Sequence, residues 1–214
     1  MISRFISCTA GCLMLFGSVA SAQSNWPQFR GETAGVVADD PRLPDSWGPN
    51  ENIVWSIDVP GTSWSSPIVW DEHVFVVTAT RIDGGDDPVD PVETYRARSL
   101  GGSMTAANVE QATNPMRWMI YDVDFSTGEI RWEKAIHTAV PSLPTHQKTS
   151  YAAETPVTDG KRVYVYLGDI GLFAFSFDGE LDWSVQMEWL PRRDWGSATS
   201  PVVHDGRIYV VNDN

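Results

Sequence analysis

Three copies of one short pattern recur along the chain, and this repetition limits the possible fold more than any other feature. In each copy a hydroxyl-bearing residue precedes a proline, a β-branched residue stands seven positions after the proline, and an aromatic residue follows it. A polar turn separates two short apolar runs, which predicts a β-hairpin with the proline at the first strand position, where it removes no ladder donor. The copies occupy residues 66–77, 155–166 and 200–211.

A second motif, Gly-x-[Ile/Leu]-x-Trp, alternates with these hairpins. It occurs at 128–132 and 179–183, with a glycine-less echo at 52–55, and an apolar strand precedes each complete copy. One repeat therefore predicts four short strands. Pro156 and Pro201 are 45 residues apart, which falls within the ~40–50 residues of a propeller blade.

The first full repeat is longer than the second. Pro67 and Pro156 are 89 residues apart, and the excess maps to about residues 80–117. Because this insertion is rich in glycine, proline and small polar residues, we expect a long surface loop, with a short helix around 106–111.

Together these patterns predict an all-β chain that forms a β-propeller of four-stranded blades. A blade buries both faces only against neighbouring blades, which is why blades form closed rings of ~4–8. The sequence supplies about two and a half blades of an incomplete ring and stops within the third. We therefore expect the sequence to be the N-terminal part of a longer protein. Trp55 would belong to an orphan last strand that closes the ring against C-terminal strands outside this sequence. The fragment alone is expected to be poorly stable, because its open blade faces and strand edges are unpaired.

Residues 1–22 have the pattern of a secretory signal peptide. Arg4 supplies the positive start, residues 5–19 carry no charge, and residues 20–22 have the small-x-small pattern of a cleavage site. We therefore expect an exported bacterial protein of the periplasm or the exterior, with no transmembrane segment in the mature chain. A lead-in segment at 23–50 and a partial propeller domain at 51–214 would follow.

Both cysteines, Cys8 and Cys12, lie inside the predicted signal peptide. The mature chain would then have no disulfide, no thiolate metal site and no cysteine nucleophile. An alternative takes residues 9–12 as a lipoprotein acylation site, but the apolar run continues beyond Cys12 through Phe16.

The charge balance limits the partners. The chain has 15 Lys and Arg against 28 Asp and Glu, a formal net charge of -13, with no basic stripe. Nucleic acid and anionic lipid surfaces are therefore poor partners. A neutral or cationic ligand, or a protein partner, remains open.

From about residue 50 to residue 214, the alternating hairpins and Gly-x-[Ile/Leu]-x-Trp motifs resemble the tryptophan-docking repeats of pyrroloquinoline-quinone (PQQ)-type β-propellers. Residues 26–31 with Leu43, Pro44 and Trp47 are similar to the opening of exported bacterial members of that family. Its relatives include quinoprotein dehydrogenases and a lipoprotein that helps assemble outer-membrane barrels. The resemblance implies the fold more firmly than an activity.

The loops that enter the innermost strands would line the mouth of the central channel, and the resemblance directs attention to them. Aromatic residues there could stack on a planar quinone, and basic residues could bind its carboxylates through charge-assisted hydrogen bonds. Glu154 or Asp194 could act as a general base. Alternatively, the tryptophans pack between blades and the arginines are solvated or paired with Asp194. The candidate binding residues are Trp64, His146, Lys148, Tyr151, Arg192, Arg193 and Trp195.

Other patterns predict no metal site. The carboxylates from Asp122 to Glu133 imitate a calcium loop, but Thr127 stands where the sharp bend needs glycine, so a hairpin turn over 126–128 explains them better. Acidic residues at 83–93 fit a solvated loop among prolines and glycines. His73, His137, His146 and His204 lack paired metal-ligand spacing. The cofactor is open: PQQ is possible, and calcium is possible but unsupported.

Three functions are compatible with these patterns. The first is an exported binding or scaffolding module that presents the channel mouth to a protein or small ligand. The alternative is a PQQ-dependent oxidoreductase acting on an alcohol or sugar, although dehydrogenases of the family typically place a cysteine pair and a calcium beside the quinone. A weaker alternative is a scaffold for outer-membrane barrel assembly, whose known relative is membrane-tethered.

Overall fold

The computed structural model describes residues 25–36, 39, 41, 43–82, 109–110, 114–142, 145–146, 149–168, 170–187 and 197–211. All regular structure in these residues is β, as the repeats predicted. No helix long and apolar enough to cross a membrane occurs in this part of the chain.

The first four-stranded sheet is antiparallel and has the order β1-β2-β4-β5. Its strands are β1 (Ile68–Trp70), β2 (His73–Arg81), β4 (Met116–Asp124) and β5 (Ile130–Ala139). Sequence neighbours pair in turn, so each connection is a hairpin, and the insertion lies between β2 and β4.

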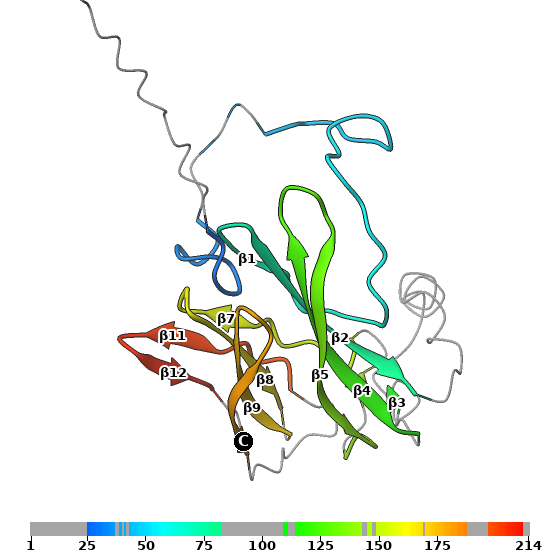
Figure 1. Ribbon diagram of the computed structural model, residues 1–214, viewed down its shortest axis with the longest axis vertical. Coiled ribbons are helices and arrows are strands. Elements are labelled where there is room, and N and C mark those ends of the chain that lie inside the picture. The colour runs from blue at the N-terminus through cyan, green and yellow to red at the C-terminus, as the bar shows by residue number, and fades with distance from the viewer. Residues whose placement is uncertain are drawn as a thin grey trace, which may run out of the picture.

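The second sheet repeats this arrangement in the order β7-β8-β9-β10. Its strands are β7 (Val157–Thr158), β8 (Arg162–Leu167), β9 (Gly171–Ser176) and β10 (Leu181–Gln186). A third hairpin, β11 (Val202–His204) with β12 (Arg207–Tyr209), begins the next repeat. These are two blades and the first half of a third, which confirms the predicted incomplete propeller (Figure 1).

The first strands of the three repeats lie next to one another, with β7 in contact with both β1 and β11. They are therefore the inner strands, and β5 and β10 form the rim. We call the end where the inner strands begin, at Trp64–Ser66, Ala152–Thr155 and Ser197–Ser200, the mouth end. The opposite end, where the inner strands turn back in their hairpins, is the turn end.

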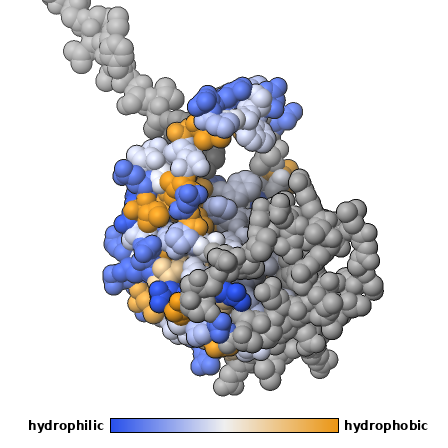
Figure 2. Space-filling view, turned by 90° about the vertical axis from the view of Figure 1, so that its right-hand side faces the viewer, coloured by the Kyte–Doolittle hydropathy of each residue, from blue (hydrophilic) through white to orange (hydrophobic). Residues whose placement is uncertain are grey.

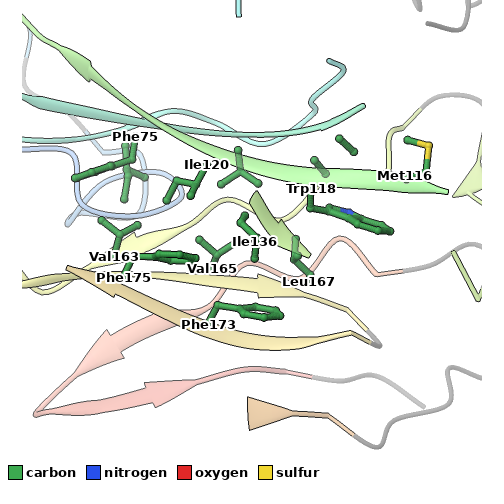
Figure 3. Packing of buried hydrophobic residues seen from close by; sticks show 14 residues of the cluster. Phe75, Met116, Trp118, Ile120, Ile136, Val163, Val165, Leu167, Phe173 and Phe175 are labelled. Atoms are coloured by element: carbon green, nitrogen blue, oxygen red, sulfur yellow. The ribbon is translucent and has the colours of Figure 1, made fainter. Parts of the chain in front are cut away.

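The main hydrophobic core lies between the two blades. Aromatic and branched side chains from the facing sides of both sheets interdigitate there, which provides the burial that a single blade lacks. Figure 3 shows Phe75, Trp118, Ile120 and Ile136 of the first blade facing Val163, Val165, Phe173 and Phe175 of the second.

A tryptophan also fastens the first blade to the second at the turn end. The indole Nε1 of Trp132, on β5, donates a hydrogen bond of 2.7 Å to the carbonyl of Phe177. A Cβ atom on Gly179 would stand 2.8 Å from the Trp132 ring, and the φ of this residue is +80°. Only glycine allows this close approach in that conformation, which explains the Gly-x-[Ile/Leu]-x-Trp motif.

Trp55 docks on the first blade in the same way. Its Nε1 donates a 2.8 Å hydrogen bond to the carbonyl of Phe125, and its ring lies against Gly128. Residues 53–59 pair with no strand in the described chain, and the prediction that Trp55 belongs to a last strand that closes the ring stays a prediction. Side-chain packing on the outer face of the first sheet holds this segment instead.

The insertion differs from its predicted form where it is described. Val109–Glu110 is not helical but forms β3, which pairs with β6 (Thr145–His146). The pairing satisfies backbone groups that a helix of this length would leave largely unpaired. His146 was predicted in a loop and lies in strand β6. The remaining residues of the predicted helix, 106–108 and 111, lie outside the described residues.

The lead-in segment adds to the inner edge of two blades near the turn end. Trp26 pairs with Val69 of β1, and the carbonyl of Pro27 accepts a 2.9 Å hydrogen bond from Thr158 N of β7. Asn25 Oδ1 accepts a further bond from Asp71 N. Figure 1 shows this segment, in blue, beside β1.

Figure 2 shows hydrophobic patches separated by hydrophilic residues on one face of the molecule.

Candidate functional site at the mouth end

The hydroxyl residue before each proline links one inner strand to the next. Ser66 N donates a 2.9 Å hydrogen bond to Thr155 Oγ1, and Thr155 N donates one of 3.0 Å to Ser200 Oγ. Equivalent positions of three repeats are therefore joined in series around the mouth. The sequence showed that a hydroxyl recurs here, and the structure shows that it accepts the amide hydrogen of the preceding repeat.

Trp64 stands on a loop that these contacts hold in place. Both Trp64 N and Ser65 N donate to the carbonyl of Ala152, at 3.0 and 3.1 Å, and the Ser63 and Ser65 hydroxyls lie 2.8 Å apart. The Trp64 side chain is 49% exposed although its backbone is anchored. The mouth thus presents an aromatic side chain on an anchored loop.

Tyr151 belongs to the boundary of the inter-blade core. Its ring packs edge-on against Trp118, with ring centroids 6.4 Å apart, and its carbonyl accepts a 2.6 Å hydrogen bond from Trp118 Nε1. The indole of Trp118 therefore anchors the mouth loop of the second blade.

Glu154 is buried, with 5% of its surface exposed, beside Thr155 at the start of β7. A Cβ atom on Gly168 would lie 3.4 Å from Glu154 Oε1 and 3.2 Å from Ser197 Cβ, so these three residues meet closely. Burial makes the ionised form of a carboxyl group costly unless polar partners compensate, and Glu154 has such an interaction.

The structure brings Trp64, Glu154 and Ser197 to one end of adjacent inner strands. His146 is described by its backbone alone. The other predicted site residues, Lys148, Arg192, Arg193, Asp194 and Trp195, lie outside the described residues. The described loops entering β1, β7 and β11 contain hydroxyl, aromatic and carboxyl groups and no basic residue.

A second group of ionisable residues, which no sequence pattern had indicated, lies at the turn end. Asp122 is fully buried, a hydrogen bond of 2.8 Å joins its Oδ2 to His73 Nδ1, and its Oδ1 has no partner in the described chain. Burial raises the pKa of Asp122, and the bond to His73 opposes that shift. The His73 ring packs on Phe177 of the next blade, so this pair supports the blade interface.

Asp124 caps the hairpin that had imitated a calcium loop. Its Oδ1 accepts hydrogen bonds from the backbone N–H groups of Ser126 and Thr127, and Arg131 donates to its Oδ2 at 2.5 Å. The bond from Arg131 and those from the turn hold the pKa of Asp124 well below its ordinary value. These contacts are those of a hairpin turn, and within the described chain no His, Asp and Glu cluster is arranged to hold a metal ion.

Residues 97–214, more than half of the chain, match the model of a PQQ-repeat family described as "Outer membrane protein assembly factor BamB". The chain belongs to this family. Its blades, tryptophan contacts and inner-strand prolines are thus those of a PQQ-like repeat propeller.

Comparison with solved structures finds similarity to BamB from Moraxella catarrhalis, with 15% sequence identity and a TM-score of 0.32. The alignment covers 70% of this chain and 41% of that BamB chain, so this chain spans less than half of its length. A comparison with curated proteins found no match.

Proposed function

We propose that this protein is an exported binding or scaffolding module that presents the mouth end of a PQQ-like repeat propeller to a protein or small ligand. The observation that carries the proposal is the half-exposed Trp64 on a loop anchored by the Ala152 carbonyl. Such preorganisation lowers the entropic cost of binding, because the loop is already held in one conformation.

The charge of the chain supports a neutral or cationic ligand at this site. The net charge is -13, and one of the carboxyl groups behind it, that of Glu154, is buried at the mouth. The hydroxyls of Ser63 and Ser65 contact each other and the carbonyls of Ala152 and Val77, so they stabilise the loop that carries Trp64. An exposed aromatic face binds uncharged polar surfaces well.

The test compares Trp64→Ala with Trp47→Ala in the intact protein expressed in its own host. Trp47 lies in the lead-in segment and is 70% exposed, so its loss removes a similar ring away from the mouth. We expect the partner or ligand that co-purifies with the wild type, identified by mass spectrometry, to be lost with Trp64→Ala and kept with Trp47→Ala. A quinone absorbance together with dye-linked alcohol oxidation that requires Glu154 would overturn the proposal in favour of a dehydrogenase.

A second candidate is a scaffold for outer-membrane protein assembly, which the description of the matching family model favours. On this hypothesis the partner at the mouth is an assembly component of the envelope. Affinity purification from envelope extracts is expected to recover such a component with the wild type and to lose it with Trp64→Ala. Recovery of no barrel-assembly component would rule this candidate out.

A further inference from the structure

A pocket of about 380 Å³ lies between the outer strands of the two blades, away from the inner strands. Residues of β4, β5, β9 and β10 line it, together with the turn at Ile170 and the segment that follows β5. Its size falls within the range of small-molecule and side-chain pockets, roughly 300–1,000 Å³. Its walls include Trp118, His137, Val140, Phe173, Ser184 and Gln186.

Three aromatic rings from the two facing sheets line this pocket. The His137 ring lies between Trp118 and Phe173, with centroid distances of 6.0 and 6.4 Å and interplanar angles of 46° and 43°. Tilted rings at these separations favour a further aromatic ring against their edges and faces. Figure 3 shows Trp118 and Phe173 approaching from the two facing sheets.

The pocket also selects by charge. Among the lining residues that the structure describes there is no Asp, Glu, Lys or Arg, although the chain as a whole is strongly acidic. A charged group entering it would lose hydration without gaining an ionic partner, which is unfavourable. The pocket therefore favours an uncharged aromatic group.

The strand that borders the pocket has a free edge. Among the described strands β10 pairs with β9 alone, so its other edge can accept a further strand. The Val185 carbonyl points toward β9, because a Cβ atom on Gly171 would lie 2.5 Å from it. By strand alternation the backbone groups of Ser184 and Gln186, both pocket residues, point to the free edge.

The two rim strands differ in how this edge is protected. Strand β5 carries Arg131, Glu133 and Lys134, and such charges discourage pairing with another chain. Strand β10 carries one charge, Asp182, at the end far from the pocket, and none from Ser184 to Gln186. The pairing edge and the aromatic pocket therefore coincide on β10.

We propose that this inter-blade pocket binds an extended peptide segment of a partner protein, which inserts an uncharged aromatic side chain between the blades and pairs with the free edge of β10. Main-chain hydrogen bonds to Ser184 and Gln186 would supply affinity, and the pocket would supply selectivity. This site lies on the outer strands at the mouth end, apart from the inner-strand loops, and Trp64 is not among its lining residues.

The test uses the tripeptide Ac-Thr-Phe-Thr-NHMe as the probe and the imidazole signals of the intact protein in NMR as the reporter. Four histidines occur in the chain, so the His137 signal can be assigned by its loss in His137→Gln. We expect the probe to shift the His137 signal saturably and leave the His73 and His204 signals in place. Replacing the probe's Phe with Asp should weaken binding at least tenfold, and N-methylating the Phe amide should weaken it about fivefold.

Two variants locate the site. Ser184→Phe fills the pocket from β10 and is expected to abolish the shift, whereas Thr138→Phe places the same ring on an exposed position of β5 outside the lining and is expected to leave it intact. Unchanged His73 and His204 signals confirm that each variant is folded. Absence of a saturable His137 shift, equal binding of the Asp peptide, or equal loss in both variants would overturn the proposal. Trp64→Ala is expected to leave the shift unchanged, so failure here and failure of the mouth proposal are distinguishable.

Discussion

Replacing Gly179 with alanine tests whether tryptophan docking holds neighbouring blades together. The alanine must adopt a φ of +80°, which costs about 1–2 kcal/mol for an L-residue. Its Cβ would stand 2.8 Å from the Trp132 ring, so the indole must move and lose its hydrogen bond to the Phe177 carbonyl, a loss of about 1 kcal/mol. We expect Gly179→Ala to lower the free energy of unfolding by about 2–3 kcal/mol.

Gly206→Ala is the matched control. Its φ is +68°, and a Cβ atom there meets nothing within 4 Å, so the variant suffers the conformational cost alone. Urea denaturation followed by circular dichroism measures both variants in the intact protein. In a Trp132→Ala background, Gly179→Ala should cost no more than Gly206→Ala, because no ring remains to be displaced. Equal destabilisation by both alanines in the wild-type background would refute the docking of Trp132 as the cause.

The remaining predictions concern the mouth and the turn end. Thr155→Val removes the buried hydroxyl that accepts the Ser66 N–H, so urea denaturation should show a free energy of unfolding lower by about 1–3 kcal/mol. Thr155→Ser keeps the hydroxyl and should retain most of the stability. Equal losses in the two variants would contradict a role for the hydroxyl. Because the pKa of Asp124 in the folded protein is lowered from its ordinary value of 3.8, its contribution to stability is complete above that value and is lost as the pH falls below about 4. Asp124→Asn keeps an oxygen that can accept the backbone N–H groups of the turn but removes the charge. From pH 6 to pH 2 the free energy of unfolding of this variant should therefore fall less steeply than that of the wild type. An equally steep fall would exclude this role of Asp124.

The repeats made the fold predictable because each motif specifies a local structure that recurs. The proline-led hairpins predicted β1–β2, β7–β8 and β11–β12, and the glycine–tryptophan motif predicted β5 and β10. The Trp55 motif also reported docking, because its ring lies against Gly128 as that of Trp132 lies against Gly179. The pairing of β3 with β6 joins residues of an insertion that follows no repeat, so periodicity held no information about it.

The candidate site was less predictable because its residues meet only across blades. The inner-strand loops could be placed at the mouth from their position before each proline, and the structure puts Trp64 and Glu154 there. The hydrogen bonds from Ser66 to Thr155 and from Thr155 to Ser200 join residues 89 and 45 positions apart. The recurring hydroxyl was the available signal, whereas no sequence pattern indicated the inter-blade pocket around His137 or the pairing of His73 with Asp122.

A crystal structure of the intact protein tests most directly whether the chain is part of a propeller with its binding surface at the mouth. We expect β1, β7 and β11 to surround a central channel, with β5 and β10 on the rim and the Trp64 ring open to solvent at the mouth. Rim strands facing the axis, or a Trp64 ring buried between blades, would contradict this arrangement.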